Sequence, residues 1–359
     1  MPWVALFGGT AVLDWLTIRV PYTALADEVL RVVETHGDRI VRYCPRTGDL
    51  RWESAAWDTI RSDSHQVLAR LGSDALHVQG SPARAVGDAD AVFGPQPPQS
   101  PSEGARAMVR HVSRALGVIL PQDPRLWVCS RMDCTVHLAL DSLADVRVAL
   151  SLLRGVEGGR YRVSQQAGDT VYWSHRSRLR AGKAYSKGPH LRWMQKQANY
   201  SGREYSASEL EAADCLLRLE CRLGAQYWRE RAETPWCEWS ASDVDAAAWA
   251  YFDRMLGDTE MAHVTDVEAA IRKVIAKNGE PITEGTARAA LGTWGLISSF
   301  GWERAKTMVS KRTWYRHLGI LRDAGLSDAD ISAGRVIELR ALRLSEARRV
   351  FSWSDLRAA

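Results

Sequence analysis

The chain has 359 residues, of which 46% are apolar and 25% are charged, and its net charge is +4. This length predicts two domains rather than one. This net charge is too small to attract a polyanion through the protein as a whole, so any such partner must bind to local clusters of basic residues. No run of about 18 apolar residues occurs, so the sequence predicts no membrane-spanning helix.

The cysteines and the N-terminal residues carry no signature of secretion. The six cysteines form no C-x-x-C pair and show no zinc-type spacing with histidine. This pattern favours reduced thiols in a cytoplasmic protein. Residues 1–15 are apolar but lack a basic start and an A-x-A cleavage pattern. They therefore predict a short extension, or an early start codon, ahead of the first strand and not a signal peptide.

The first half of the chain alternates strand and helix signals. Strands are predicted at residues 15–22, 39–44, 50–54, 75–82 and 125–140, where β-branched and alternating residues gather. One helix ends near Thr35. A second follows the Pro- and Ser-rich loop at 94–104, with Ser102 as its N-cap and its end near Leu120.

The second half changes from strands to helices. After a helix at 142–155, strands are predicted at 170–174 and 180–187. Residues 214–223 alternate as a strand does, although the Ser-Ala-Ser-Glu before them could instead start a helix through this segment. From about Thr234 helical spacing predominates. The prediction is an α+β fold, with an α+β domain over residues 1–235 and a mainly helical domain over 236–359.

One tyrosine lies in a strongly basic segment. Residues 170–203 contain eight Lys or Arg and no acidic residue, and Tyr185 stands among them. In an extended strand, side chains alternate between two faces. One face then holds Lys183, Tyr185 and Lys187, and the other holds the small residues Gly182, Ala184 and Ser186, which can pack closely. A tyrosine in a strand is most often a packing residue, so both a packing and a reactive role stay open.

The same alternation places polar residues on one face of three other strands. These residues are Asp133, Glu220 and His77, each between apolar neighbours. Carboxylate oxygens suit Mg²⁺ or Mn²⁺, and such an ion can polarise a phosphate that a phenolate attacks. Only about one phenol in a thousand is ionised at neutral pH, so the lysines beside Tyr185 are expected to favour the phenolate. Surface ion pairs and a hydrogen-bonded histidine are the alternatives that spacing alone leaves open.

A basic amphipathic helix is predicted near the C-terminus. Trp314, Leu318 and Leu321 form an apolar stripe, and the opposite side holds Lys311, Arg312, Tyr315, Arg316 and Arg322. A short helical segment at 302–310 precedes it, which is compatible with a helix-turn-helix reader of duplex DNA. A bundle helix with a solvated basic face fits the same spacing.

Six segments, in order, resemble the filamentous-phage gene II replication initiators. They are "DWLTIRVPY", "GSPARAVGDADAVFG", "SRMDCTV", "TVYWSHRSRLRAGKAYSKGPHL", "LLRLECRL" and "KRTWYRHLGILRDAGLS". They cover nearly the whole chain, and the tyrosine segment is the most specific. These initiators are rolling-circle nickases of the HUH-related type, and plasmid initiators of the staphylococcal type are similar at a greater distance. The resemblance implies an antiparallel-sheet, HUH-like nuclease domain.

The resemblance also implies roles for residues at matching positions. Tyr185 would be the nucleophile and Lys187 its basic companion, while Asp133 and Glu220 would bind Mg²⁺ or Mn²⁺. His77 is kept as a third ligand because a neutral imidazole binds metals, although no His-hydrophobic-His motif is visible. The expected DNA contacts are Arg176, Arg178, Arg180 and Lys183 in the tyrosine segment, and Lys311, Arg312 and Arg316 near the C-terminus.

The implied function is nicking of one strand of a supercoiled replicative form at its origin. The freed 3′-hydroxyl would prime synthesis, and the protein would later cut and recircularise the displaced single strand. Expected partners are these DNAs, a host helicase and a host polymerase, in the host cytoplasm and without a membrane. A non-catalytic origin-binding replication regulator is the alternative from another class. A tyrosine transposase or relaxase on a similar scaffold is the enzymatic alternative.

Overall fold

The computed structural model describes most of the chain. It covers residues 11–35, 39–55, 60–61, 67–86, 90, 92–95, 98–154, 163, 168–198, 200, 202–256, 264–276, 279–326, 328–333 and 347–358. Residues 1–10 of the predicted N-terminal extension lie outside these ranges, and the first strand begins at Val12, three residues earlier than predicted. No helix in the described ranges is both long and apolar enough to cross a membrane.

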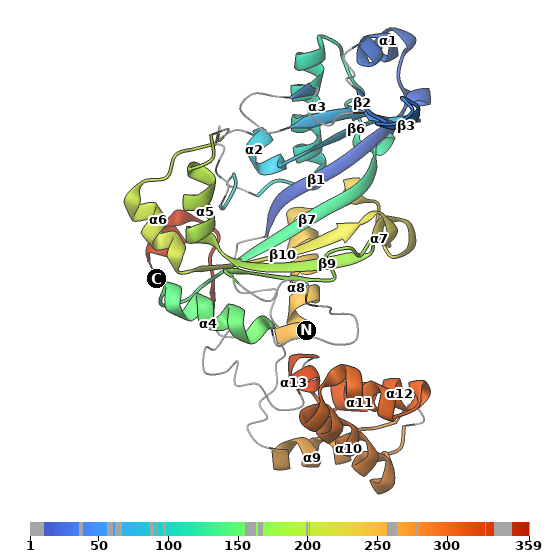
Figure 1. The fold of residues 1–359 in the computed structure, drawn as a ribbon. Helices are drawn as coiled ribbons and strands as arrows, with labels where there is room; N and C mark the ends of the chain where they lie inside the picture. The colour runs from blue at the N-terminus through green and yellow to red at the C-terminus, as the bar shows by residue number, and fades with distance from the viewer. Residues whose placement is uncertain are drawn as a thin grey trace.

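A single antiparallel sheet organises the first part of the chain (Figure 1). In spatial order its strands are β4 (Ile60–Arg61), β5 (Leu68–Leu71), β6 (Ala75–Gly80), β1 (Val12–Pro21), β7 (Val128–Ala139), β10 (Leu216–Gly224), β9 (Arg180–Ser186) and β8 (Thr170–Trp173). A ninth strand, β11 (Arg348–Arg349), pairs with β7. A separate hairpin joins β2 (Arg39–Tyr43) to β3 (Leu50–Ala55). The predicted α+β fold with an antiparallel sheet is confirmed.

Helices cover one face of this sheet and bury its apolar side chains. α3 (Pro101–Leu116) packs on β1 and β6, α4 (Leu143–Arg154) on β8, β9 and β10, and α8 (Ala241–Leu256) on β1, β7 and β10. The shared core contains Leu16, Met132, Leu219, Leu150 and Phe252 among others. The alternation predicted for the long strands holds, because Met132, Cys134, Leu219 and Cys221 all lie in this core.

Shorter helices lie around the sheet and at the strand ends. They are α1 (Asp27–Thr35), α2 (Pro82–Val86), α5 (Lys187–Gln195), α6 (Ala207–Asp214), α7 (Ala225–Glu230) and α14 (Trp353–Arg357). Residues 214–223 were predicted as a strand, with a helix as the alternative, and the structure contains a helix followed by a strand. Ser206 caps α6 in a capping box with Glu209, and the helix ends at Asp214, just before the strand begins at Leu216.

Three local predictions were wrong. Ser100, and not Ser102, is the N-cap of α3, because Ser100 and Glu103 form a capping box around the first turn. The helix also ends at Leu116 instead of Leu120, where Gly117 adopts a φ of 67°. Lys187 was expected to end the tyrosine strand, but β9 stops at Ser186 and Lys187 is the first residue of α5.

A second, helical unit has its own core. It consists of α9 (Val264–Arg272), α10 (Glu284–Phe300), α11 (Trp302–Met308), α12 (Lys311–Asp323) and α13 (Asp328–Ala333), and its buried residues run from Val267 to Ile331. The division differs from the predicted boundary after residue 235. α8 packs on the sheet through Val244, Ala248 and Phe252, and residues 347–358 return to the sheet as β11 and α14.

Candidate active site

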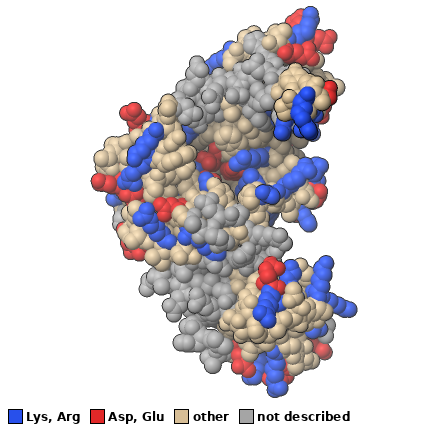
Figure 2. All heavy atoms as spheres, viewed as in Figure 1, with Lys and Arg blue, Asp and Glu red and all other residues tan. Residues whose placement is uncertain are grey.

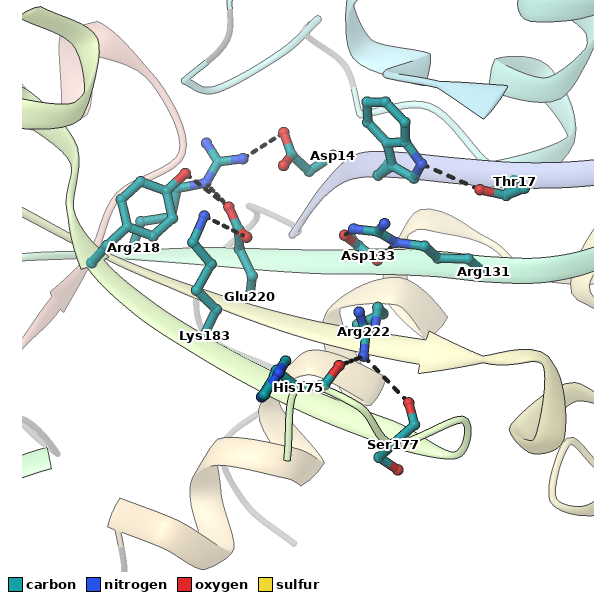
Figure 3. A network of polar contacts seen from close by, with 12 residues as sticks. Asp14, Thr17, Arg131, Asp133, His175, Ser177, Lys183, Arg218, Glu220 and Arg222 are labelled. Atoms are coloured by element: carbon teal, nitrogen blue, oxygen red, sulfur yellow. Dashed lines mark hydrogen bonds and ion pairs between the residues drawn. The ribbon is translucent and has the colours of Figure 1, made fainter. Parts of the chain in front are cut away.

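Tyr185 lies on the face of the sheet that points away from α8. It is 3% exposed, and its hydroxyl donates a hydrogen bond to Glu220 Oε1 at 2.8 Å. Lys183 Nζ lies 3.5 Å from Glu220 Oε2, and Arg218 Nε lies 3.0 Å from Glu220 Oε1. The predicted convergence of the tyrosine strand with the strand of Glu220 is therefore present in the structure (Figure 3).

Gly182 allows β9 to pack closely against α8. A Cβ at Gly182 would lie 2.5 Å from the ring of Tyr251 on α8, so only glycine lets strand and helix approach this closely. The small face predicted for this strand packs against structure as expected, with Ala184 fully buried. The alternating partner residues, Lys183 and Tyr185, are thereby directed to the opposite side.

Asp14 joins the cluster through an irregularity in β1. The pairing of β1 with β7 shifts register between Leu13 and Trp15, and both Leu13 and Leu16 are buried in the core. Two residues, Asp14 and Trp15, therefore occupy the space between core positions, as a β-bulge allows. Asp14 Oδ1 lies 2.5 Å from Arg218 Nη2. Sequence alternation misses Asp14, because an unbroken strand would place it on the same face as Leu16.

Arg218 is the central cation of the site. Its side chain is 1% exposed. Besides Asp14 and Glu220, it contacts His137 Nε2 at 3.1 Å and the carbonyl oxygen of Val92 at 3.2 Å. Although burial raises the pKa of Asp14, Arg218 and Lys187 together hold that pKa below its usual range. Asp14 is therefore a carboxylate at neutral pH.

Asp133 lies on β7, opposite Trp15 on one side and Arg222 on the other. It is 5% exposed, and both of its oxygens accept hydrogen bonds from Arg131, one from Nε at 2.8 Å. Burial raises its pKa, Arg131 opposes this, and the charges of Glu220 and Asp14 raise it further. Three carboxylates from β1, β7 and β10 thus act on one another electrostatically.

His77 does not belong to this cluster, so its predicted role as a metal ligand is not supported. It pairs in register with Arg19 on β1, four residues beyond Trp15, which corresponds to about 13 Å along the strand. Burial lowers the pKa of His77 to about 4, and Arg70 and Arg19 add to this effect. His77 is therefore a neutral side chain among arginines.

The ionisation of Tyr185 differs from the expectation that lysines favour its phenolate. Burial raises its pKa well above the ordinary value, Arg218 lowers it, and Glu220 and Asp14 raise it. The ammonium groups of Lys183 and Lys187 lie 3.9 Å and 5.8 Å from the centre of the ring. Burial and Arg218 lower the pKa of Lys187. Tyr185 is thus a neutral phenol, and Arg218 is the cation that most favours its ionisation.

His190 on α5 is a further neighbour that the sequence did not single out. Its ring lies 4.9 Å from that of Tyr185 in an edge contact. Burial, together with Lys187 and Lys183, lowers its pKa to about 3, so the imidazole is neutral. Among the described residues its Nδ1 has no hydrogen-bond partner. The sequence showed only that it follows Tyr185 by five residues, and it is the fourth residue of α5 in the structure.

The predicted DNA contacts of the tyrosine segment lie on the hairpin of β8 and β9. Arg176 and Arg178 are exposed in its turn, and Arg180 stacks over the ring of Tyr227 at 4.8 Å. Arg222 supports this turn from β10, because its Nη2 donates to the carbonyl oxygens of His175 and Ser177. Figure 2 shows acidic atoms in a hollow in the middle of this face, with Lys and Arg around them.

The other predicted DNA contacts lie in the helical unit. Lys311, Arg312 and Arg316 are exposed on α12, and Trp314, Leu318 and Leu321 are buried on its opposite side. The predicted apolar stripe is confirmed. Ser310 caps the helix through the backbone N–H of Thr313.

A divalent metal ion would need several oxygen ligands. The cluster contains suitable carboxylates, but they are not grouped around one point. Within the described ranges no three His, Cys, Asp or Glu side chains are grouped closely enough to hold one ion. Asp14, Asp133 and Glu220 are hard oxygen donors of the kind that Mg²⁺ and Mn²⁺ prefer. Each is paired with a basic side chain here. The donor chemistry therefore fits such an ion, whereas the present spacing does not form a closed site.

Comparison with known proteins gives a family match over most of the chain. The family model "Replication-associated protein G2P N-terminal" matches residues 12–256, which begin at β1, end with α8 and include Asp14, Asp133, Tyr185 and Glu220. A search of curated proteins gives no match. Among solved structures the chain is similar to a rolling circle replication initiator protein from Geobacillus stearothermophilus, with 12% identity, a TM-score of 0.26 and coverage of 60% of this chain and 75% of that one. The family match confirms the resemblance to the gene II replication proteins, and the chain belongs to this family of replication-associated proteins.

Proposed function

We propose that this protein is a site-specific DNA nickase that initiates rolling-circle replication with Tyr185 as its nucleophile. The observation that carries the proposal is the hydrogen bond from the Tyr185 hydroxyl to Glu220 inside a cluster of cations. Any acceptor would satisfy the hydroxyl of a buried packing tyrosine, whereas a carboxylate can also take up its proton. Membership of a replication-associated family supports DNA as the substrate.

The residues present can carry out the transfer of a phosphoryl group. The phenolic proton passes toward Glu220, and the Tyr185 oxygen forms a bond to phosphorus. The bond from phosphorus to the 3′-oxygen breaks, and that oxygen takes up a proton. Lys183 and Arg218 lie where they can offset the negative charge that develops on the phosphate. The resulting phosphotyrosine link retains the energy of the broken bond, so reversal rejoins a strand.

A divalent ion is part of this proposal. We expect Mg²⁺ or Mn²⁺ to be held by Asp133 and Glu220, with the carboxylate of Asp14 as the third ligand in place of His77. When bound, the ion would neutralise charge on the scissile phosphate. The basic partners Arg131 and Arg218 would then have to release part of their present contacts with these carboxylates.

The proposed substrates and partners follow from the reaction. The substrate is supercoiled replicative-form DNA of a filamentous phage at its origin, and the displaced single strand is cut and joined later. The freed 3′-hydroxyl needs a host polymerase, and strand displacement needs a host helicase, so we place the protein in the host cytoplasm.

The test is cleavage of supercoiled DNA that carries the phage origin, with and without Mg²⁺. The wild type should convert it to the nicked form only with the metal. Tyr185→Phe should fold and bind DNA but leave it uncut, whereas Tyr172→Phe on the neighbouring strand should cut normally. Tight origin binding without metal-dependent cleavage would instead identify a replication regulator.

Peptide mapping identifies the nucleophile directly. A suicide oligonucleotide with the origin sequence should trap the protein through Tyr185. Tyr200 is the competitor in the following segment, but its hydroxyl donates to the carbonyl oxygen of Arg203 at 2.6 Å. An adduct on Tyr172 or Tyr200 would contradict the assignment. Efficient cleavage and joining at sites unrelated to an origin would favour a transposase or relaxase.

A further inference from the structure

The last described residues of the chain, 347–358, return from the helical unit to the sheet. β11 pairs with β7 through Arg348 opposite Ala139 and Arg349 opposite Leu138, and the N–H of Val350 donates to the carbonyl oxygen of His137 at 3.2 Å. At these positions β10 occupies the other edge of β7. The segment therefore lies beside the strand that carries Asp133, although it follows the family match by some ninety residues.

This segment closes a small apolar core. Val350 and Leu356 pack in it with buried residues from several other parts of the chain. These residues are Val92, Phe93, Ala139, Leu191, Tyr205, Ala213 and Leu216. Asp90 is the polar centre, since it is 3% exposed and its Oδ2 accepts a hydrogen bond from Trp353 Nε1 at 2.8 Å. Its Oδ1 accepts from the Tyr205 hydroxyl and from the N–H of Val92, both at 2.9 Å.

The same core touches the side chain that organises the active site. The ring of Phe93 lies between those of Trp353 and His137, with ring centres 5.4 Å and 5.1 Å away. The carbonyl oxygen of Val92 and Nε2 of His137 both contact Arg218 Nη1. Arg218 in turn contacts Glu220, which accepts the hydrogen bond from the candidate nucleophile. A continuous set of contacts thus joins Trp353 to the tyrosine.

A second anchor holds the segment to α8. Arg349 forms an ion pair with Asp245, and its guanidinium lies over the ring of Trp249 at 5.0 Å. Both side chains of the pair are less than one fifth exposed, so the contact is shielded from water more than most surface ion pairs. The segment is therefore fixed at β11 and at α14, on either side of the short linker between them.

We propose that residues 347–358 form a C-terminal clasp that positions Arg218 for the reaction of Tyr185. This inference rests on the proposed nickase function. The clasp residues do not touch the reacting atoms, so they are positioning residues. A further consequence is that the helical unit is inserted between two parts of one catalytic domain.

The test uses full-length variants and single-turnover cleavage of a single-stranded origin oligonucleotide. Trp353→Phe keeps an aromatic ring but removes the hydrogen bond to Asp90, and Trp353→Ala removes both. Tyr43→Phe is the control, because Tyr43 is 59% exposed on the separate hairpin of β2 and β3, outside the clasp and the site. The rate constant of adduct formation and its final amplitude are measured separately, together with KM.

We expect the rate constant to fall by about tenfold in Trp353→Phe and further in Trp353→Ala, since small displacements of positioning groups cost this much or more. KM and the amplitude in Trp353→Phe should stay close to those of the wild type. A reduced amplitude with a normal rate constant would show that the clasp only stabilises the fold, and would overturn the inference. Wild-type kinetics in Trp353→Phe would overturn it too, while the nickase proposal stands. If the wild type itself forms no adduct, the nickase proposal fails first.

Discussion

Glu220 and Asp133 are both buried carboxylates, but they have different hydrogen-bond partners. Glu220 accepts the Tyr185 hydroxyl, whereas Asp133 is held by Arg131. We predict that Glu220→Gln and Asp133→Asn each abolish nicking while origin binding is kept, because each removes a charge and little volume. Nicking of supercoiled DNA and fluorescence anisotropy are the measurements. Asp74→Asn, on an exposed turn, serves as the control. Full activity in both site variants would remove them from the reaction.

His77 should affect the stability of the folded protein at acid pH and not the rate of nicking. Its pKa in the folded protein is about 4, below the ordinary value of 6.5, mainly because of burial. The unfolded chain therefore takes up the proton first. The stability from neutral His77 is complete above pH 6.5 and is lost as pH falls toward 4.

We predict that His77→Gln weakens this acid sensitivity without affecting nicking. Urea unfolding at pH 7.5 and pH 5 should show a smaller loss of stability in the variant, by about 1 kcal/mol or less once solvent screening is allowed for. An equal loss in both proteins would show that His77 is not the titrating group. A loss of nicking at pH 7.5 would reopen its role as a ligand.

At the scale of single strands, alternation correctly predicted which face a side chain occupies wherever the strand is regular. It predicted that Lys183 and Tyr185 share a face and that Glu220 points the same way, and the contacts agree. It failed at Asp14, where a bulge in β1 inserts one extra residue. A bulge depends on the pairing of two strands distant in sequence, so local spacing does not reveal it. His190 was missed for a similar reason, since α5 folds back over Tyr185 only in the tertiary structure.

The contact of β9 with α8 predicts an unusually sensitive glycine. In Gly182→Ala the new methyl group would overlap the ring of Tyr251. We expect a loss of about 1–3 kcal/mol in unfolding free energy, as for other overpacked sites. The control is Gly292→Ala on α10, where an added Cβ would meet no atom beyond its own helical backbone within 4 Å, and helix propensity should raise stability by up to about 1 kcal/mol. Urea unfolding distinguishes the two. A neutral Gly182→Ala would mean that α8 moves away easily.

At the scale of the whole molecule, the sequence predicted a helical C-terminal unit but not the return of the chain. The apolar stripe of α12 gave a strong local signal, and Trp314 and Leu318 are indeed buried. β11, however, has only two paired residues, which is too short for a strand pattern. Its position depends on β7, more than two hundred residues earlier. The match to residues 12–256 likewise leaves out this segment.

Because the helical unit has a separate core, its predicted role in DNA binding can be tested apart from catalysis. Lys311, Arg312 and Arg316 are exposed on one side of α12. We predict that replacing all three by alanine weakens binding to origin duplex and makes its salt dependence shallower. Each lost phosphate contact should remove about 0.9 from the slope of log K against log salt. Cleavage of a single-stranded oligonucleotide should continue, because the proposed catalytic cluster lies on the sheet.

A variant with the same change in net charge provides the control for this prediction. The control variant replaces three basic residues of the same unit. Arg272 ends α9, Lys273 follows it, and Arg288 lies on α10. Both arginines form ion pairs with Glu284. Their replacement by alanine should leave the salt slope nearly unchanged if α12 makes the phosphate contacts. Equal effects of the two triple variants would mean that only overall charge matters. An unchanged slope in the α12 variant would show that α12 is a bundle helix with a solvated basic face, and that duplex DNA is read elsewhere.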